Sequence, residues 1–113
     1  MNHPELDMAA LVARLEALRA ELQAQSEAGR EARETVMLDQ TSVGRLSRMD
    51  ALQGQAMAQA EEQRRQLAQQ RITGALARID RSEYGECIAC GDWIDARRLE
   101  RDPLVLKCID CAE

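Results

Sequence analysis

The sequence predicts a mainly α-helical protein, in which a long antiparallel helical hairpin is followed by a small module containing four cysteines. Three observations support this fold class. The chain has 113 residues and is 45% hydrophobic but only 2% aromatic, so side chains that bury large areas are scarce. Leucines near the N-terminus recur at coiled-coil spacing, and all the cysteines lie between Cys87 and Cys111. We expect a hairpin over residues 1–83 and the cysteine module over residues 84–113.

The first arm of the hairpin is predicted from apolar residues whose spacing alternates between three and four, as in a helix that packs against another helix. These residues are Met8, Leu11, Leu15, Leu18 and Leu22. We expect residues 1–4 to be frayed, with Pro4 suited to the first helical turn. Gly29 continues the same register and should weaken or bend the helix, because glycine disfavours helical backbone.

The tip of the hairpin is predicted near residues 39–50, where residues 41–44 include Thr, Ser and Gly, which favour turns. Ser47 and Asp50 fit a capping box at the start of a second helix. The tip therefore separates two helical arms that run in opposite directions.

The second arm has helical composition from about residue 46 or 47 to residue 82. Its apolar stripe drifts instead of holding strict heptads. We expect residues 67–79 to lie near residues 8–22 of the first arm. The alternative is an intermolecular coiled coil, in which the turn-forming residues are incidental.

The cysteine module contains two C-x-x-C pairs, Cys87 with Cys90 and Cys108 with Cys111, which enclose seventeen residues. Zinc prefers four tetrahedral ligands, and this spacing is typical of a four-cysteine zinc site. Gly91 follows the first pair and gives the backbone the freedom that a tight turn needs. Because four thiolates fill the coordination sphere, we predict one structural Zn²⁺ ion and no zinc catalysis.

The four cysteines have three alternative uses. Two disulfides would need an oxidising compartment, a redox-active C-x-x-C pair would be expected beside a βαβ pattern, and an iron–sulfur cluster is less usual at this spacing. Zinc fits better than each of them. The residues expected to form a small core around the metal are Trp93, Ile94, Leu99, Leu104, Leu106 and Ile109. Trp93 could instead be an exposed contact residue.

The charge balance argues against a nucleic-acid-binding protein. The net charge is −5, and residues 84–113 contain seven acidic and four basic residues, so the chain should repel a phosphate backbone. Direct binding would require Arg64, Arg65, Arg71 and Arg78 to gather on one face, and their spacing leaves this open. The sequence shows neither a membrane-length apolar run nor a signal peptide, so we expect a cytoplasmic protein without membrane contact.

The C-terminal block YGECIACGDWIDARRLERDPLVLKCIDC, preceded by a helical hairpin, resembles the DksA/TraR family of bacterial transcription factors. The resemblance extends from about residue 5 to residue 113. It rests on Tyr84-Gly85, Cys87, Cys90-Gly91, Ile94, Arg97-Arg98-Leu99-Glu100, Pro103 and Cys108-Ile109-Asp110-Cys111. It implies a monomer that binds bacterial RNA polymerase directly instead of DNA. It also implies that the hairpin enters the secondary channel of the polymerase and modulates initiation, in many members together with the alarmone guanosine tetraphosphate.

The resemblance also suggests functional residues, by position. The family's D-x-x-D-x-A tip is absent in that form, and the candidates here are Asp50 with Ala51 and, across the turn, Asp39. Either carboxylate could instead only stabilise a helix end. By their distance from the first zinc cysteine, Arg71 and Arg64 are the candidate alarmone contacts. They could equally be ordinary solvated helix residues.

The sequence does not predict an enzyme. It offers no Ser/His/Asp or Cys/His constellation, because the single histidine, His3, falls in the expected frayed start. The main rival to a polymerase-binding regulator is an adaptor, a zinc-stabilised coiled coil that binds another protein and never contacts polymerase. The tip separates the two, since an inserted factor needs functional groups there and an adaptor needs its exposed helix faces.

Overall fold

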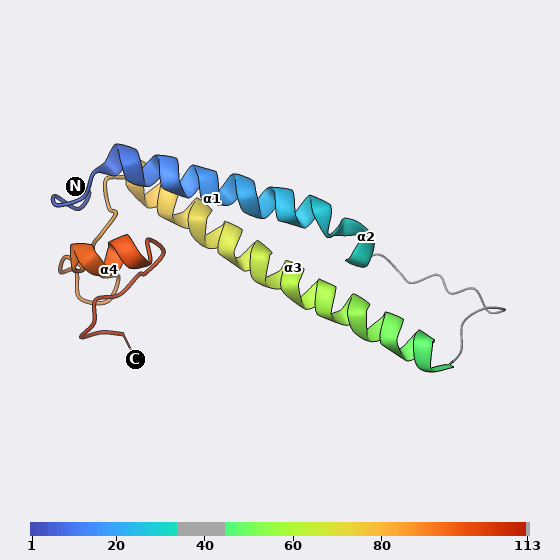
Figure 1. Cartoon of the computed structure of the whole chain (residues 1–113). Coiled ribbons are helices and arrows are strands. Elements are labelled where there is room, and N and C mark those ends of the chain that lie inside the picture. Colours follow the sequence, from blue (N-terminus) through green and yellow to red (C-terminus); the bar gives the residue numbers. More distant parts are fainter. Residues whose placement is uncertain (34–44, 113) are drawn as a thin grey trace. The chain divides into compact units, whose positions relative to one another are not determined.

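The computed structural model describes residues 1–33 and 45–112, with the side chains of residues 32 and 45–47 excepted. Within these ranges the chain forms the helices α1 (Met8–Ala28), α2 (Arg30–Arg33), α3 (Arg45–Asp80) and α4 (Ala96–Arg101) (Figure 1). The helices α1 and α3 run antiparallel, and a cluster of four cysteines follows them. The predicted mainly helical fold class is confirmed.

The chain divides into two compact units. Unit 1 contains residues 1–19 and 69–113, that is, the start of the first arm, the end of the second arm and the cysteine module. Unit 2 contains residues 20–68 and therefore the remainder of both arms. The predicted boundary between the hairpin and the cysteine module, at residues 83 and 84, stays a prediction.

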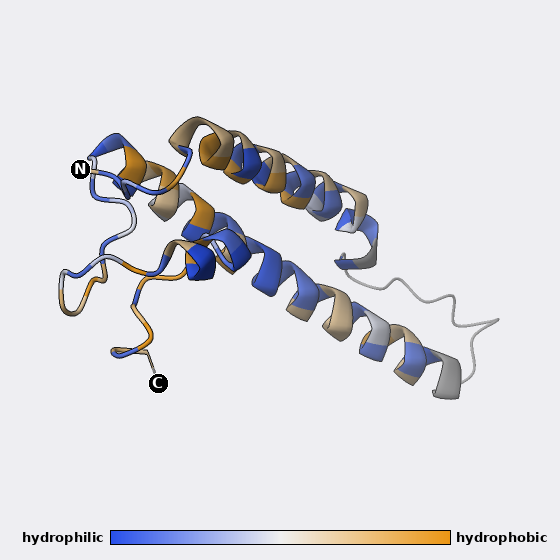
Figure 2. Ribbon diagram, turned by 60° about the vertical axis from the view of Figure 1, so that its left-hand side comes forward, coloured by the Kyte–Doolittle hydropathy of each residue, from blue (hydrophilic) through white to orange (hydrophobic). Residues whose placement is uncertain are grey.

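The apolar core of the hairpin lies in unit 1. Leu11 and Leu15 of α1 are buried, as are Ile72 and Ala75 of α3. This agrees with the predicted pairing of the first arm with the second, except that Leu67 is exposed. Figure 2 shows the same distribution, because apolar residues gather toward the C-terminal end of α3 and its middle is hydrophilic.

The observed helix ends correct two predictions. The first helix begins at Met8, after Pro4, and the backbone N–H of Ala10 donates to the carboxylate of Asp7 at 3.1 Å. Asp7 thus satisfies one of the amides that a helix start leaves without a partner. Helix α3 begins at Arg45, so Ser47 lies inside it and the predicted capping box is wrong.

The three glycines of the arms behave differently. The first arm is interrupted at Gly29, between α1 and α2, as its weakening effect predicted. Helix α3 instead runs continuously through Gly54 and Gly74. A Cβ atom at either of these positions would meet nothing within 4 Å, so no side chain packs against them.

The N-terminal segment is docked and not frayed, which corrects the expectation for residues 1–4. The side-chain amide of Asn2 donates to the carbonyl of Ile79 at 3.1 Å, and its oxygen accepts from the backbone N–H of Tyr84 at 3.0 Å. His3 is only 4% exposed, and its Nε2 lies 2.7 Å from the carbonyl oxygen of Ile94. These contacts make residues 2 and 3 part of unit 1.

None of the helices in the described ranges is both long enough and apolar enough to span a lipid bilayer.

Candidate metal centre

The four cysteines come together from two short backbone turns. In the first turn the N–H of Gly91 donates to the carbonyl of Cys87 at 2.9 Å, and in the second Ala112 donates in the same way to Cys108 at 2.9 Å. Gly91 has a φ of +80°, a left-handed conformation that favours glycine, as predicted for this position. Both C-x-x-C pairs therefore present their sulfurs from the same kind of turn.

Backbone hydrogen bonds join the two turns to one another. The first turn is flanked by an isolated antiparallel bridge between Glu86 and Trp93, and the N–H of Cys87 donates to the carbonyl of Asp92 at 2.8 Å. The N–H of Ile88 donates to the carbonyl of Leu106 at 3.0 Å, which ties the first turn to the segment that precedes the second. The cluster thus has a local backbone framework of its own.

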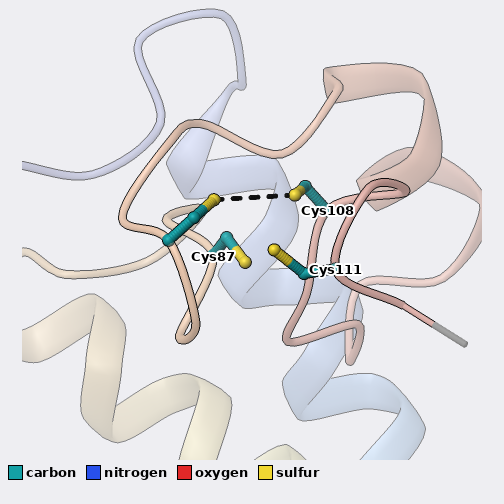
Figure 3. Close-up of side chains that lie close together, drawn as sticks. Cys87, Cys108 and Cys111 are labelled. Carbon is teal, nitrogen blue, oxygen red and sulfur yellow. Dashed lines mark hydrogen bonds between the residues drawn. The ribbon is translucent and has the colours of Figure 1, made fainter.

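The geometry of the sulfurs fits a tetrahedral zinc ion. The four Sγ atoms lie within 4.8 Å of one another, and those of Cys90 and Cys108 are 3.7 Å apart. Figure 3 shows the sulfurs of Cys87, Cys108 and Cys111 pointing toward one another. Zinc–sulfur bonds of about 2.3 Å imply a separation of about 3.8 Å between sulfurs at the corners of a tetrahedron. The observed spacing is thus close to what Zn²⁺ requires, and all four cysteines are free of disulfides.

The electrostatics of the thiols support a bound cation. The backbone N–H of Cys108 lowers the pKa of the Cys87 thiol to about 6, although burial acts in the opposite direction. Hydrogen bonding with the Cys108 thiol raises the pKa of Cys111 to about 12. Neighbouring thiolates repel one another, so one ionises readily while another holds its proton. A divalent ion would supply the positive charge that lets all four ionise together.

The small core beside the metal centre differs in part from the prediction. Ile94 and Leu99 are each 1% exposed, which confirms them as core residues. Trp93, Leu106 and Ile109 are exposed by 39%, 42% and 75%, so placing them in the core was wrong. Tyr84, which was not predicted as a core residue, is fully buried, and its hydroxyl donates to the carbonyl of Pro103 at 2.7 Å.

Helix α4 is held by contacts at both of its ends. At its start, the carboxylate of Asp95 accepts from the backbone N–H of Arg97 at 2.8 Å, and this bond keeps the pKa of Asp95 below its usual range. Near its end, the guanidinium of Arg14 in α1 donates to the carbonyl of Glu100 at 2.7 Å. The segment between the cysteine pairs is therefore anchored to the hairpin within unit 1.

Comparison with known proteins now identifies this module. Residues 82–113 match the sequence family described as the prokaryotic dksA/traR C4-type zinc finger. The C-terminal module is thus similar to the dksA/traR C4-type zinc fingers. This confirms the predicted family resemblance for the module and the predicted structural zinc site.

Two individual proteins extend the comparison. The chain is 42% identical over 41 residues to the RNA polymerase-binding transcription factor DksA of Haemophilus influenzae, a match that spans 36% of this chain but only 28% of that protein. The structure of transcription factor DksA2 from Pseudomonas aeruginosa covers 94% of this chain with a TM-score of 0.73, and this chain covers 86% of it. At 23% identity, that similarity establishes a common fold of hairpin and zinc finger.

The remaining predicted site residues lie on α3 or outside the described ranges, and one of them, Arg71, borders the cavity that Cys111 also lines. Asp50 is exposed in the first part of α3, with the half-buried Ala51 next to it, and Asp39 lies outside the described residues. Arg64 is exposed on α3 in unit 2. Arg71 is exposed in unit 1, where it lines a cavity of ≈ 700 Å³ together with Lys107 of the zinc finger.

Sequence reasoning missed two buried residues of unit 1, which contains the metal centre, and one polar cluster in unit 2. Tyr84 enters the sequence prediction only through the family resemblance, although a single tyrosine in a chain with few aromatic residues is a signal for a core position. The position of His3 near the start of the sequence gives no sign that its side chain is buried. A polar cluster around Glu62 in unit 2 had no sequence signal beyond helical charge spacing.

Proposed function

We propose that this protein binds bacterial RNA polymerase directly and regulates the initiation of transcription. The observation that carries the proposal is the zinc-finger match, together with a curated relative whose name describes RNA polymerase binding. The shared fold with a transcription factor of similar length supports it. The protein acts as a non-enzymatic factor and as a monomer.

The hairpin is the part that reaches into the polymerase. Its tip, predicted near residues 39–50, enters the secondary channel and presents a carboxylate near the catalytic centre. Asp50 is the first candidate, because it is solvent-exposed and lies inside α3, where it has no capping-box role. Asp39 is the second candidate, and Ala51 borders Asp50 on the same helix.

The zinc finger has a structural role in this mechanism. Cys87, Cys90, Cys108 and Cys111 would hold a Zn²⁺ ion, which would join the two cysteine turns, and their four thiolates would leave no position for substrate. The finger is then fixed to the hairpin by the hydrogen bond that the guanidinium of Arg14 donates to the carbonyl of Glu100. The finger therefore stabilises the base of the hairpin, and the tip is the part that acts on the polymerase.

The alarmone guanosine tetraphosphate is a candidate effector. Arg71 supports this assignment, because it shares a cavity with the basic residue Lys107, and neither side chain has an ion-pair or hydrogen-bond partner among the described residues. Arg64 is the second candidate. If the alarmone binds here, Arg71→Ala should abolish its effect on transcription and leave polymerase binding intact, whereas Arg101→Ala should change neither.

The decisive experiment combines a core-polymerase pull-down with single-round transcription. Wild type should bind and alter transcription from a responsive promoter. Asp50→Asn, Asp39→Asn or both should bind but lose the effect, while the exposed Asp80→Asn at the other end of α3 serves as the matched control. A wild-type protein that does not bind polymerase would refute the proposed function. Binding with unchanged transcription in both tip variants would remove only the tip assignment.

The rival function is that of a coiled-coil adaptor for another protein. The exposed apolar residues Met49, Leu52 and Met57 on α3 would suit any protein partner. The pull-down separates the two functions, because an adaptor would not retain core polymerase.

A further inference from the structure

Unit 2 contains a buried cluster of charged and polar side chains. Glu62 of α3 accepts a hydrogen bond from the Ser26 hydroxyl at 2.5 Å and forms ion pairs with Arg33 at 3.2 Å and Arg65 at 3.3 Å. The Glu62 side chain is only 9% exposed, and those of Arg33 and Arg65 are 20% and 17% exposed. We call these four residues the Glu62 cluster. It connects α1, α2 and α3.

The cluster occupies the place that an apolar core would normally take. The buried apolar residues of the described chain all lie in unit 1. In the described part of unit 2, Glu62 is the only residue classed as buried. Packing of apolar side chains therefore does little to fix how the arms align there, and the directional contacts of Glu62 must do so.

Arg33 shows what the cluster holds in place. Its guanidinium donates to the carbonyl of Ser26 at 2.8 Å, across the interruption at Gly29. Its own carbonyl accepts from the side-chain amides of Gln55 and Gln59 at 3.4 Å. The side chains of Gln55, Gln59 and Glu62 on α3 thus all contact Arg33. Arg33 is the last residue of α2 and of the described first arm.

Gly29 is part of the same arrangement. A Cβ atom at this position would lie 3.1 Å from Nη1 of Arg33 and 3.3 Å from Nη2 of Arg65. The absence of a side chain lets both guanidinium groups approach the backbone while they pair with Glu62. The break between α1 and α2 and the ion pairs therefore depend on one another.

We propose that Glu62 is a positioning residue, which fixes α2 against α3 and so sets the point from which the chain departs toward the tip. This inference rests on the proposed polymerase function and deepens it. Glu62 itself contacts no polymerase in this mechanism. Its loss should leave polymerase binding nearly unchanged but let the first arm, which leads to Asp39, shift relative to Asp50 on α3 inside the channel.

The test measures binding and regulation separately in Glu62→Gln, Arg33→Gln and the double variant. Glu62→Gln keeps the shape of the side chain and removes its charge, and Glu61→Gln, at the exposed neighbouring position, is the matched control. We expect polymerase affinity within about threefold of wild type but an effect on transcription, at saturating factor, reduced about tenfold, because small misplacements of a reacting group are costly. The double variant should lose no more than either single one, because both remove the same contact.

A second measurement does not depend on polymerase. Amide hydrogen exchange in Arg30–Arg33 should be about tenfold faster in Glu62→Gln than in wild type or Glu61→Gln, since local opening controls exchange. Fluorescence of Trp93, in unit 1, should be unchanged and shows that the zinc finger stays folded.

Each outcome decides something. Unchanged exchange would show that Glu62 does not hold α2, and this would overturn the inference. Faster exchange with a full transcriptional effect would overturn the positioning role alone. If wild type does not bind polymerase, the proposed function fails and the positioning role falls with it, while the exchange data still report whether the cluster holds α2.

Discussion

Two glycines of the zinc-finger region have left-handed backbone conformations, but their surroundings differ. Gly91 has a φ of +80° and open space where a Cβ atom would lie. Gly85 has a φ of +99°, and a Cβ atom there would lie 2.6 Å from the Cβ of His3. Gly91 is therefore required for its conformation alone, whereas Gly85 is required for conformation and for space.

This difference predicts unequal effects of alanine. Gly91→Ala should lower the free energy of unfolding of unit 1 by about 1–2 kcal/mol, the cost of left-handed backbone for an L-residue. Gly85→Ala should cost more, because it also displaces His3. When both proteins compared already carry His3→Gly, Gly85→Ala should cost only about as much as Gly91→Ala, because the clash is absent. Chemical denaturation, followed by the fluorescence of Trp93, measures the free energy of unfolding of these variants. Equal losses of stability in Gly91→Ala and Gly85→Ala would contradict the steric explanation.

Tyr84 gives the base of the hairpin a dependence on alkaline pH. Burial raises the pKa of its hydroxyl to about 12, although the nearby charges of Arg78 and Arg14 act in the opposite direction. The unfolded chain should ionise near pH 10, so the folded state is favoured by the neutral hydroxyl below pH 10. That contribution should be lost as the pH rises from about 10 to about 12.

Tyr84→Phe tests this contribution. At neutral pH the variant should lose about 1 kcal/mol of stability with the hydrogen bond to Pro103. Between pH 10 and pH 12 its stability should fall less steeply than that of wild type, because it has no hydroxyl to ionise. Phenolate absorbance follows the titration directly, since Tyr84 is the only tyrosine. Parallel pH profiles in the two proteins would exclude Tyr84 as the cause.

At the scale of elements, the arms show when a glycine ends a helix. Gly29 lies between α1 and α2, next to two arginine side chains that occupy the space beside it. Gly54 and Gly74 lie within α3 and have no neighbours in the direction of a side chain. The intrinsic cost of glycine is similar at each position, so the tertiary contacts of the Glu62 cluster determine where the first arm breaks.

Alanine at the two open positions should therefore stabilise α3. Gly54→Ala and Gly74→Ala should each raise the free energy of unfolding by about 0.5–1 kcal/mol, because alanine restricts the unfolded chain and fits the helix without a clash. Circular dichroism during thermal unfolding measures the effect. A loss of stability in either variant would indicate a contact at that face which the structure does not contain.

At the scale of the whole molecule, the zinc finger and the apolar core belong to the same unit. Leu15 and Ile72 of the hairpin, and Tyr84 and Leu99 of the C-terminal segment, are all buried within unit 1. A segment of about thirty residues is too small to fold on its own core, so the metal should contribute much of its stability. The stability of the hairpin base is then linked to metal occupancy.

Removal of zinc should consequently unfold the finger. A strong chelator, or Cys111→Ser, should shift the fluorescence of Trp93 and lower the unfolding temperature of unit 1, and excess Zn²⁺ should restore the chelated wild type but not the variant. Helical circular dichroism from the arms should decrease only in part. A chelated protein with unchanged fluorescence and unfolding temperature would show that zinc does not support the fold.

The sequence by itself determined the zinc site and the antiparallel hairpin. The positions of Cys87 and Cys90, like those of Cys108 and Cys111, fix a local turn whose form depends on a few neighbouring residues. The spacing of Leu11 and Leu15 likewise reports a helix face within two turns. Such short-range patterns can be interpreted without knowledge of the rest of the chain.

Only the tertiary structure decided which side chains complete these elements. His3 meets Ile94 across 91 positions of sequence, and Glu62 meets Ser26 across 36. It also showed that Trp93 and Ile109 are exposed while Tyr84 fills the core. Contacts of this kind depend on how separate segments come together in space, and hydrophobic patterning within each segment does not specify that arrangement.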